Sequence, residues 1–93
     1  MLTLVIYDIS DDKKRTRLSK KLFSFGLTRI QYSAFKGELN PHDRGVLVKK
    51  VKRYLSSDRD SIYVIPLCKK CFRLVDIVSE KEISLSEERI KIV

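Results

Sequence analysis

The first eight residues form an apolar run that ends at an acid. Residues 2–7 place apolar side chains at nearly every position, so an extended segment here would be apolar on both faces. Asp8 ends the run. The pattern predicts a central strand of a sheet that is covered on at least one side.

A helical pattern follows this strand. Residues 10–12 (Ser-Asp-Asp) offer capping oxygens and negative charge, as helix starts commonly do. Leu18, Leu22 and Phe25 then recur at positions i, i+4 and i+7, and Gly26 follows as a stop signal. We therefore expect one amphipathic helix between these two limits.

The middle of the chain repeats the alternation of strand and helix. Residues 28–39 return to period two, which predicts one bent strand or two short ones, with Gly37 as a possible bulge. Residues 40–43 (Asn-Pro-His-Asp) predict a polar turn that enters a second helix. The expected buried stripe of that helix consists of Leu47, Val51, Tyr54 and Leu55.

The last third predicts a strand and then weaker elements. Residues 61–67 are rich in β-branched side chains, and Pro66 restricts this strand to a place where one backbone donor is dispensable. Residues 72–78 fit a short helix or a strand, and residues 88–93 predict a final strand.

The order of elements sets the expected fold class. With the middle segment counted as two strands, the order is that of an α+β ferredoxin-like β-α-β-β-α-β domain. Its antiparallel sheet would carry both helices on one face. We expect a single domain over residues 1–93, with the core in residues 1–71 and a tail with a C-terminal strand in residues 72–93.

The net charge of the chain indicates which class of partner it binds. The 93 residues hold 20 Lys and Arg against 12 Asp and Glu, a net charge of +8, while 43% of the residues are apolar, as in a folded protein. A folded cationic surface favours polyanions, above all nucleic acid. No stretch approaches the ~18 apolar residues of a membrane span, and no secretory signal is evident at the start. We expect a cytoplasmic protein without membrane contacts.

Much of the positive charge falls on the two predicted helices. Lys14, Arg17 and Lys21 are spaced to form one stripe along the first. Such stripes are either solvated helix faces or phosphate-binding surfaces, and their occurrence on two helices favours the second reading. Arg15 and Arg17 point about 200° apart on a helix and cannot grip one phosphate from the same face. The predicted contacts to a nucleic-acid backbone are Lys13, Lys14, Arg17, Lys20, Lys21, Lys49, Lys52 and Arg53.

Asp8 is the main candidate for chemistry. It follows the first strand, and ligand-binding groups in open α/β sheets gather beyond the carboxyl ends of strands. Two readings are open: Asp8 caps the turn into the first helix, or it binds a metal. Magnesium can be held by one or two carboxylates with waters and substrate phosphate. Two copies of Asp8 related by a two-fold axis would therefore suffice for phosphodiester hydrolysis.

Other reactive side chains are few. His42 is isolated in the predicted turn, so catalysis by a Ser-His-Asp or Cys-His arrangement is not indicated. Cys68 and Cys71 fit a local disulfide, half of a zinc site shared across a dimer, or two small buried thiols at a strand end. We favour buried thiols, because nothing else in the sequence completes a ligand set, and assign the pair no catalytic role.

Three segments carry a resemblance to a known family. They are residues 7–17 (YDISDDKKRTR), 26–39 (GLTRIQYSAFKGEL) and 60–68 (DSIYVIPLC). In this order and at these spacings the chain resembles the small CRISPR-associated endoribonuclease family, the non-integrase core subunit of the spacer-acquisition complex. The resemblance covers roughly residues 1–71.

The resemblance implies a symmetric homodimer with a divalent metal, usually magnesium, shared at the dimer interface by the Asp8 of both subunits. It also implies cleavage of single-stranded RNA or duplex DNA, an integrase subunit as partner, and a tail strand that completes the dimer. By the same matching, the positions that support nuclease activity are Asp8, Tyr7, Arg15, Arg17, Arg29 and Phe35. The arginines would bind phosphates, whereas Tyr7 and Phe35 would contact bases or pack the sheet and dimer.

Two other functions compete with the enzyme. The first is a non-catalytic scaffold, in which the same charge bridges DNA and integrase subunits. The second is an RNA-recognition module, which shares the strand order and stacks bases on sheet aromatics. Residues 34–37 (Ala-Phe-Lys-Gly) lack the order of that module's signature, so we rank it last.

Overall fold

The computed structural model describes residues 1–80 and 91–92. The elements follow one another as β1 (Leu2–Asp8), α1 (Asp12–Ser24), β2 (Thr28–Gln31), β3 (Ala34–Glu38), α2 (Pro41–Val51), the 3₁₀ helix η1 (Lys52–Tyr54) and β4 (Ser61–Leu67). After β4 come α3 (Lys69–Arg73), β5 (Asp76–Ile77) and β6 (Lys91–Ile92). The middle segment is thus two strands.

The first four strands form one antiparallel sheet in the order β2-β3-β1-β4. This is the ferredoxin-like arrangement that the element order predicts, and that prediction is confirmed. β1 is central, paired with β3 on one side and β4 on the other. Pro66 lies in β4, at the edge of this sheet, where a missing backbone donor costs little.

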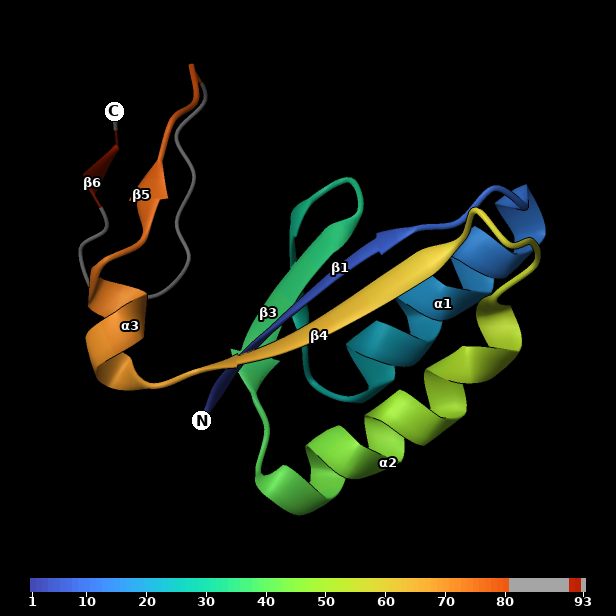
Figure 1. The fold of residues 1–93 in the computed structure, drawn as a ribbon, viewed down its shortest axis with the longest axis horizontal. Helices are drawn as coiled ribbons and strands as arrows, with labels where there is room; N and C mark the ends of the chain where they lie inside the picture. Colours follow the sequence, from blue (N-terminus) through green and yellow to red (C-terminus); the bar gives the residue numbers. More distant parts are fainter. Residues whose placement is uncertain (81–90, 93) are drawn as a thin grey trace.

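Both long helices cover one face of the sheet (Figure 1). The strands bury Val5, Tyr7 and Phe35 toward the helices. The helical layer contributes the remaining large side chains of this core, which are Leu18 and Leu22 from α1, Leu47 and Val51 from α2, and Tyr54 from η1. Full burial of each such apolar side chain stabilises the fold by roughly 1.5–3 kcal/mol, so this layer fixes the helices on the sheet.

The opposite side of the sheet is much less covered. Residues that pair directly in an antiparallel sheet point to the same side, and the pairs here are Leu4 with Ile65, Ile6 with Tyr63, and Asp8 with Ser61. Their side chains are half-buried or exposed, with Ile6 43% and Tyr63 60% accessible. We call this side the open face and define it by Leu4, Ile6, Asp8, Ser61, Tyr63 and Ile65.

Local signals place the helix ends. The Asp11 side chain caps α1 by accepting a hydrogen bond from the Lys14 backbone N–H at 2.8 Å. Asn40 caps α2 in the same way through the Asp43 N–H at 2.7 Å. Gly26, at φ +83°, ends the α1 region in the left-handed conformation that favours glycine. His42 lies in the first turn of α2, so the turn predicted there is wrong: a Pro that follows a capping Asn starts a helix.

Two further expectations need correction. Gly37 pairs regularly with Thr3, and the irregularity lies in β2 between Arg29 and Gln31. A Cβ on Gly37 would lie 2.6 Å from Leu27 Cδ2, so close packing explains this glycine. Leu55 is 42% exposed rather than buried, because the chain leaves the helical path after η1.

The segment after β4 combines both structures expected for residues 72–78. Phe72 anchors α3 in a buried position, and β5 then pairs in parallel with β6. Of the strand predicted at 88–93, residues 91–92 are a strand, and the others lie outside the described residues. Within the described part of the chain, no helix is long and apolar enough to span a bilayer.

Candidate functional site

Asp8 ends β1 on the open face, with its side chain exposed. Asp8 does not cap α1, because the side chain of Asp11 has that role. Within residues 1–80 no hydrogen bond or ion pair engages the Asp8 side chain. Of the two readings of Asp8, the structure therefore removes the cap and leaves an accessible carboxylate.

Asp60 braces the loop that follows Asp8. One of its oxygens accepts hydrogen bonds from the Ser10 N–H at 3.0 Å and the Ser10 hydroxyl at 2.9 Å. The other oxygen accepts from the backbone and hydroxyl of Ser56. The hydrogen bonds from Ser56, followed by those from Ser10, hold the pKa of Asp60 well below its usual range. An ionised Asp60 thus joins the β1–α1 loop to the chain that enters β4.

Arg15 lies at the same end of β1. Its Nη1 donates to the Ile9 carbonyl at 3.0 Å, and its Nη2 contacts Asp12. The hydrogen bond with Asp12 raises the pKa of Arg15, so this side chain stays positively charged. The guanidinium also lies 6.0 Å from the ring centre of Tyr32, in the turn between β2 and β3. The guanidinium of Arg15 is therefore held at the carbonyl of Ile9, the residue that follows Asp8.

Arg17 and Arg29 occupy different surfaces from Arg15. Arg29 extends from β2 over two aromatic rings, 5.1 Å from the centre of Phe35 and 5.7 Å from that of Phe23. Arg17 points into a groove on the helical layer. The predicted divergence of Arg15 and Arg17 is confirmed, and one chain does not gather its three arginines around a single phosphate.

Tyr7 and Phe35 lie in the core. They are 3% and 0% exposed, and their rings stack with centres 6.2 Å apart. The Tyr7 hydroxyl donates to the Tyr32 carbonyl at 3.4 Å. In this chain they pack the sheet and hold the end of β1 against the β2–β3 turn. Their burial favours packing over base contact, and their part in catalysis stays a prediction.

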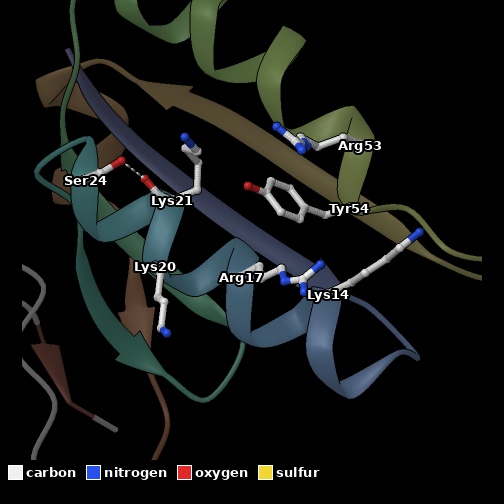
Figure 2. Close-up of a pocket in the computed structure, with 7 residues that line it drawn as sticks. All are labelled: Lys14, Arg17, Lys20, Lys21, Ser24, Arg53 and Tyr54. Atoms are coloured by element: carbon white, nitrogen blue, oxygen red, sulfur yellow. Dashed lines mark hydrogen bonds between the residues drawn. The ribbon is translucent and has the colours of Figure 1, made fainter.

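A basic groove of about 570 Å³ runs between α1 and η1 (Figure 2). None of its lining residues is acidic. Tyr54 projects between Arg17 and Arg53, and Lys14 Nζ donates to the Leu55 carbonyl at 3.4 Å. We define the basic groove by its lining residues, which are Lys14, Arg17, Lys20, Lys21, Ser24, Arg53 and Tyr54.

The residues predicted to contact a nucleic-acid backbone fall into two groups, inside and outside the basic groove. Five of the eight predicted residues line it, and they include the stripe predicted along the first helix. Lys13, Lys49 and Lys52 are exposed elsewhere on the helices. The groove belongs to the helical layer, whereas Asp8 belongs to the open face on the other side of the sheet.

The described residues contain no complete metal site. No group of three or more His, Cys, Asp or Glu side chains comes together in residues 1–80. A lone carboxylate such as Asp8 offers hard oxygen ligands that fit magnesium, which tolerates one or two carboxylates with waters. The described residues thus offer one accessible carboxylate of this kind, that of Asp8.

Cys68 and Cys71 correct an expectation. Both are exposed free thiols, not buried ones. Cys68 follows β4 at the edge of the sheet and caps the short helix α3, while the buried residue of that helix is Phe72. The short helix turns both cysteines outward.

Comparison with known proteins gives the family. A family model described as CRISPR associated protein Cas2 matches residues 1–75. The chain belongs to the Cas2 family. An Archaeoglobus fulgidus protein named CRISPR-associated endoribonuclease Cas2 1 is 52% identical over 89 residues, which cover 96% of this chain and 95% of that protein. A Desulforudis audaxviator protein named CRISPR-associated endoribonuclease Cas2 is 35% identical and covers 80% of this chain and 70% of its own length.

Solved structures, one of a Cas2 protein among them, have the same fold. The crystal structure of Streptococcus pyogenes Cas2 matches with a TM-score of 0.68 at 25% identity, over 81% of this chain and 95% of that one. A hypothetical protein from Thermus thermophilus matches with a TM-score of 0.66 at 33% identity, over 72% and 80% of the two chains. The family resemblance seen in the sequence and the fold class are both confirmed.

Sequence reasoning missed two features of this Cas2 chain. The sequence indicates Asp60 only as the first residue of the family segment 60–68, yet Asp60 directly precedes Ser61, which pairs with Asp8. The available signal in the sequence was an acid directly before the strand at residues 61–67. Tyr54 was expected only in the core, and its place in the basic groove follows from η1.

Proposed function

We propose that this Cas2-family chain is a magnesium-dependent endonuclease that hydrolyses phosphodiester bonds of single-stranded RNA, and that it serves in spacer acquisition for antiviral defence. The observation that carries this proposal is the exposed Asp8 carboxylate, left free because Asp11 caps α1. Relatives named as endoribonucleases support RNA as the substrate class. Duplex DNA is the second substrate to test.

The active unit is a homodimer. Its interface is the open face, where Ile6 and Tyr63 expose apolar surface beside Asp8. A two-fold axis across such a face makes each contact twice and brings a second Asp8 to the first. The dimer thus supplies the carboxylate that one chain lacks.

The residues around Asp8 have separate roles in this dimer. The two Asp8 side chains would hold a magnesium ion, which when bound would lower the pKa of a water and stabilise charge on the phosphate. Arg15, fixed by the Ile9 carbonyl, binds a phosphate oxygen of the substrate. Asp60 keeps the loop after Asp8 in position through Ser10.

The test compares Asp8→Asn with Asp11→Asn. Asn caps a helix about as well as Asp, so the second variant keeps the fold and matches the first in charge. We expect Asp8→Asn to cleave single-stranded RNA no faster than wild type with a chelator. Asp11→Asn should cleave like wild type in magnesium. Cleavage by Asp8→Asn at the wild-type rate would refute the catalytic role.

A DNA-binding scaffold that bridges integrase subunits is the second candidate. The basic groove favours it, because its cations lie on the helical layer, away from Asp8. Duplex-DNA binding is therefore measured beside cleavage in the same Asp8→Asn protein. Binding retained without cleavage supports both roles on separate surfaces. Cleavage that depends neither on Asp8 nor on magnesium would not come from the proposed site. The DNA-binding scaffold would then be the remaining candidate function.

A further inference from the structure

The cysteine pair lies outside the machinery proposed above. Cys68 and Cys71 flank Lys69 and Lys70 at the point where the chain leaves β4 and enters α3. Both thiols are free and exposed. They are the only cysteines in the sequence, so any thiol chemistry of this chain takes place here.

Their geometry suits an internal bond. The Cys68 Sγ already accepts a hydrogen bond from the Cys71 backbone N–H at 3.4 Å. Cys68 is the N-cap residue of α3 and has an extended backbone, and Cys71 lies in the first turn of the same helix, so the two residues are neighbours at its N-terminus. A disulfide, which needs Cβ atoms about 3.5–4.5 Å apart, would therefore close between two residues that are already in contact.

The two thiols are chemically unequal. The hydrogen bonds from the backbone and the thiol of Cys71 lower the pKa of Cys68. The hydrogen bond with Cys68, in turn, raises the pKa of Cys71. A hydrogen bond from the Lys70 backbone N–H lowers the pKa of Cys68 as well. Cys68 is thus the nucleophile of the pair, and Cys71 keeps its proton longer.

We propose that Cys68 and Cys71 form a dithiol–disulfide couple that exchanges with low-molecular-weight disulfides. The Cys68 thiolate attacks one sulfur of the external disulfide, forms a mixed disulfide and releases a thiolate. Cys71 then gives up its proton and attacks the Cys68 sulfur, which releases the second thiolate. Two protein thiols are oxidised, and the external disulfide is reduced to two thiols. The new bond restrains the chain between β4 and β5.

The experiment treats the full chain with oxidised glutathione and follows intact mass. Wild type should lose two hydrogens and retain no glutathione. Cys71→Ser should retain one glutathione on Cys68, because no second thiol can release it. Cys68→Ser should acquire its single glutathione severalfold more slowly than Cys71→Ser at neutral pH. Both substitutions are at exposed positions and keep the fold, which circular dichroism checks.

Several outcomes would overturn the proposal. They are wild type with two glutathiones, a disulfide between two chains, and equal rates for the two single variants. Zinc alone is added in a parallel arm. Stoichiometric zinc binding that blocks both thiols would assign the pair to a shared zinc site and would also overturn the couple. None of these measurements depends on nuclease activity.

Discussion

At the scale of single residues, the site depends on which acid does which task. Asp11 caps α1, Asp60 accepts hydrogen bonds from neighbouring serines, and Asp8 is exposed. Three carboxylates within one end of the sheet thus have three different environments. The division matters because a metal ligand has to be accessible, whereas a structural carboxylate is already occupied by hydrogen bonds.

Asp60 should make stability depend on acid pH. The folded chain holds the pKa of Asp60 below the value of about 3.9 of an unfolded chain. Its contribution is therefore complete above about pH 4 and is lost as the pH falls through the folded-state value. Asp60→Asn should unfold at a lower temperature than wild type at pH 7, and the difference should shrink below about pH 4.

Thermal unfolding across this pH range checks the Asp60 prediction. Asp58→Asn is the matched control, since Asp58 is an exposed acid in the same loop. That variant should follow the wild-type curve. A constant gap between Asp60→Asn and wild type from pH 7 to pH 3 would mean that ionisation of Asp60 does not matter.

At the scale of elements, glycines show where helices and strands are tightly packed. Gly37 in β3 leaves no room for a Cβ beside Leu27. Gly45 in α2 has open space around it and lies inside a helix, where Gly is about 1 kcal/mol worse than Ala. The same substitution should therefore have opposite effects in the two elements.

The glycine pair gives the second prediction. Gly37→Ala should lower the free energy of unfolding by about 1–3 kcal/mol, the usual cost of overpacking. Gly45→Ala should raise it by about 0.5–1 kcal/mol. Urea unfolding measures both. Loss of stability in Gly45→Ala, or none in Gly37→Ala, would contradict the packing seen here.

The basic groove between α1 and η1 gives the third prediction. If phosphates bind there, Arg17→Gln and Arg53→Gln should each weaken duplex-DNA binding regardless of sequence and reduce the salt-dependence slope by about 0.9. Arg59→Gln is the control, because Arg59 is exposed and lies outside the groove. Equal losses in all three variants would indicate net charge rather than a binding groove.

At the scale of the whole molecule, the sequence predicted the fold better than the site. The continuous apolar run in residues 2–7 and the helix caps predicted the element order, because local patterns report which positions are buried and where helices begin. The tasks of Asp8 and Asp60 depend on strands that are distant in sequence and meet at Asp8 and Ser61. The exposure of Cys68 depends on the turn into α3, which no periodicity indicated.

The open face gives the last prediction, because the proposed dimer would bring two Asp8 carboxylates together across it. Ile6→Glu should place a charge in the interface without disturbing the monomer, because Ile6 is already 43% exposed. Leu55→Glu is the matched control at 42% exposure, outside the sheet. Light scattering should give the mass of two chains for wild type and Leu55→Glu, and of one chain for Ile6→Glu. Ile6→Glu should also lose RNA cleavage, because separated Asp8 carboxylates leave each site half complete. A dimeric Ile6→Glu, or a monomeric variant with full cleavage, would show that the active site does not form across this face.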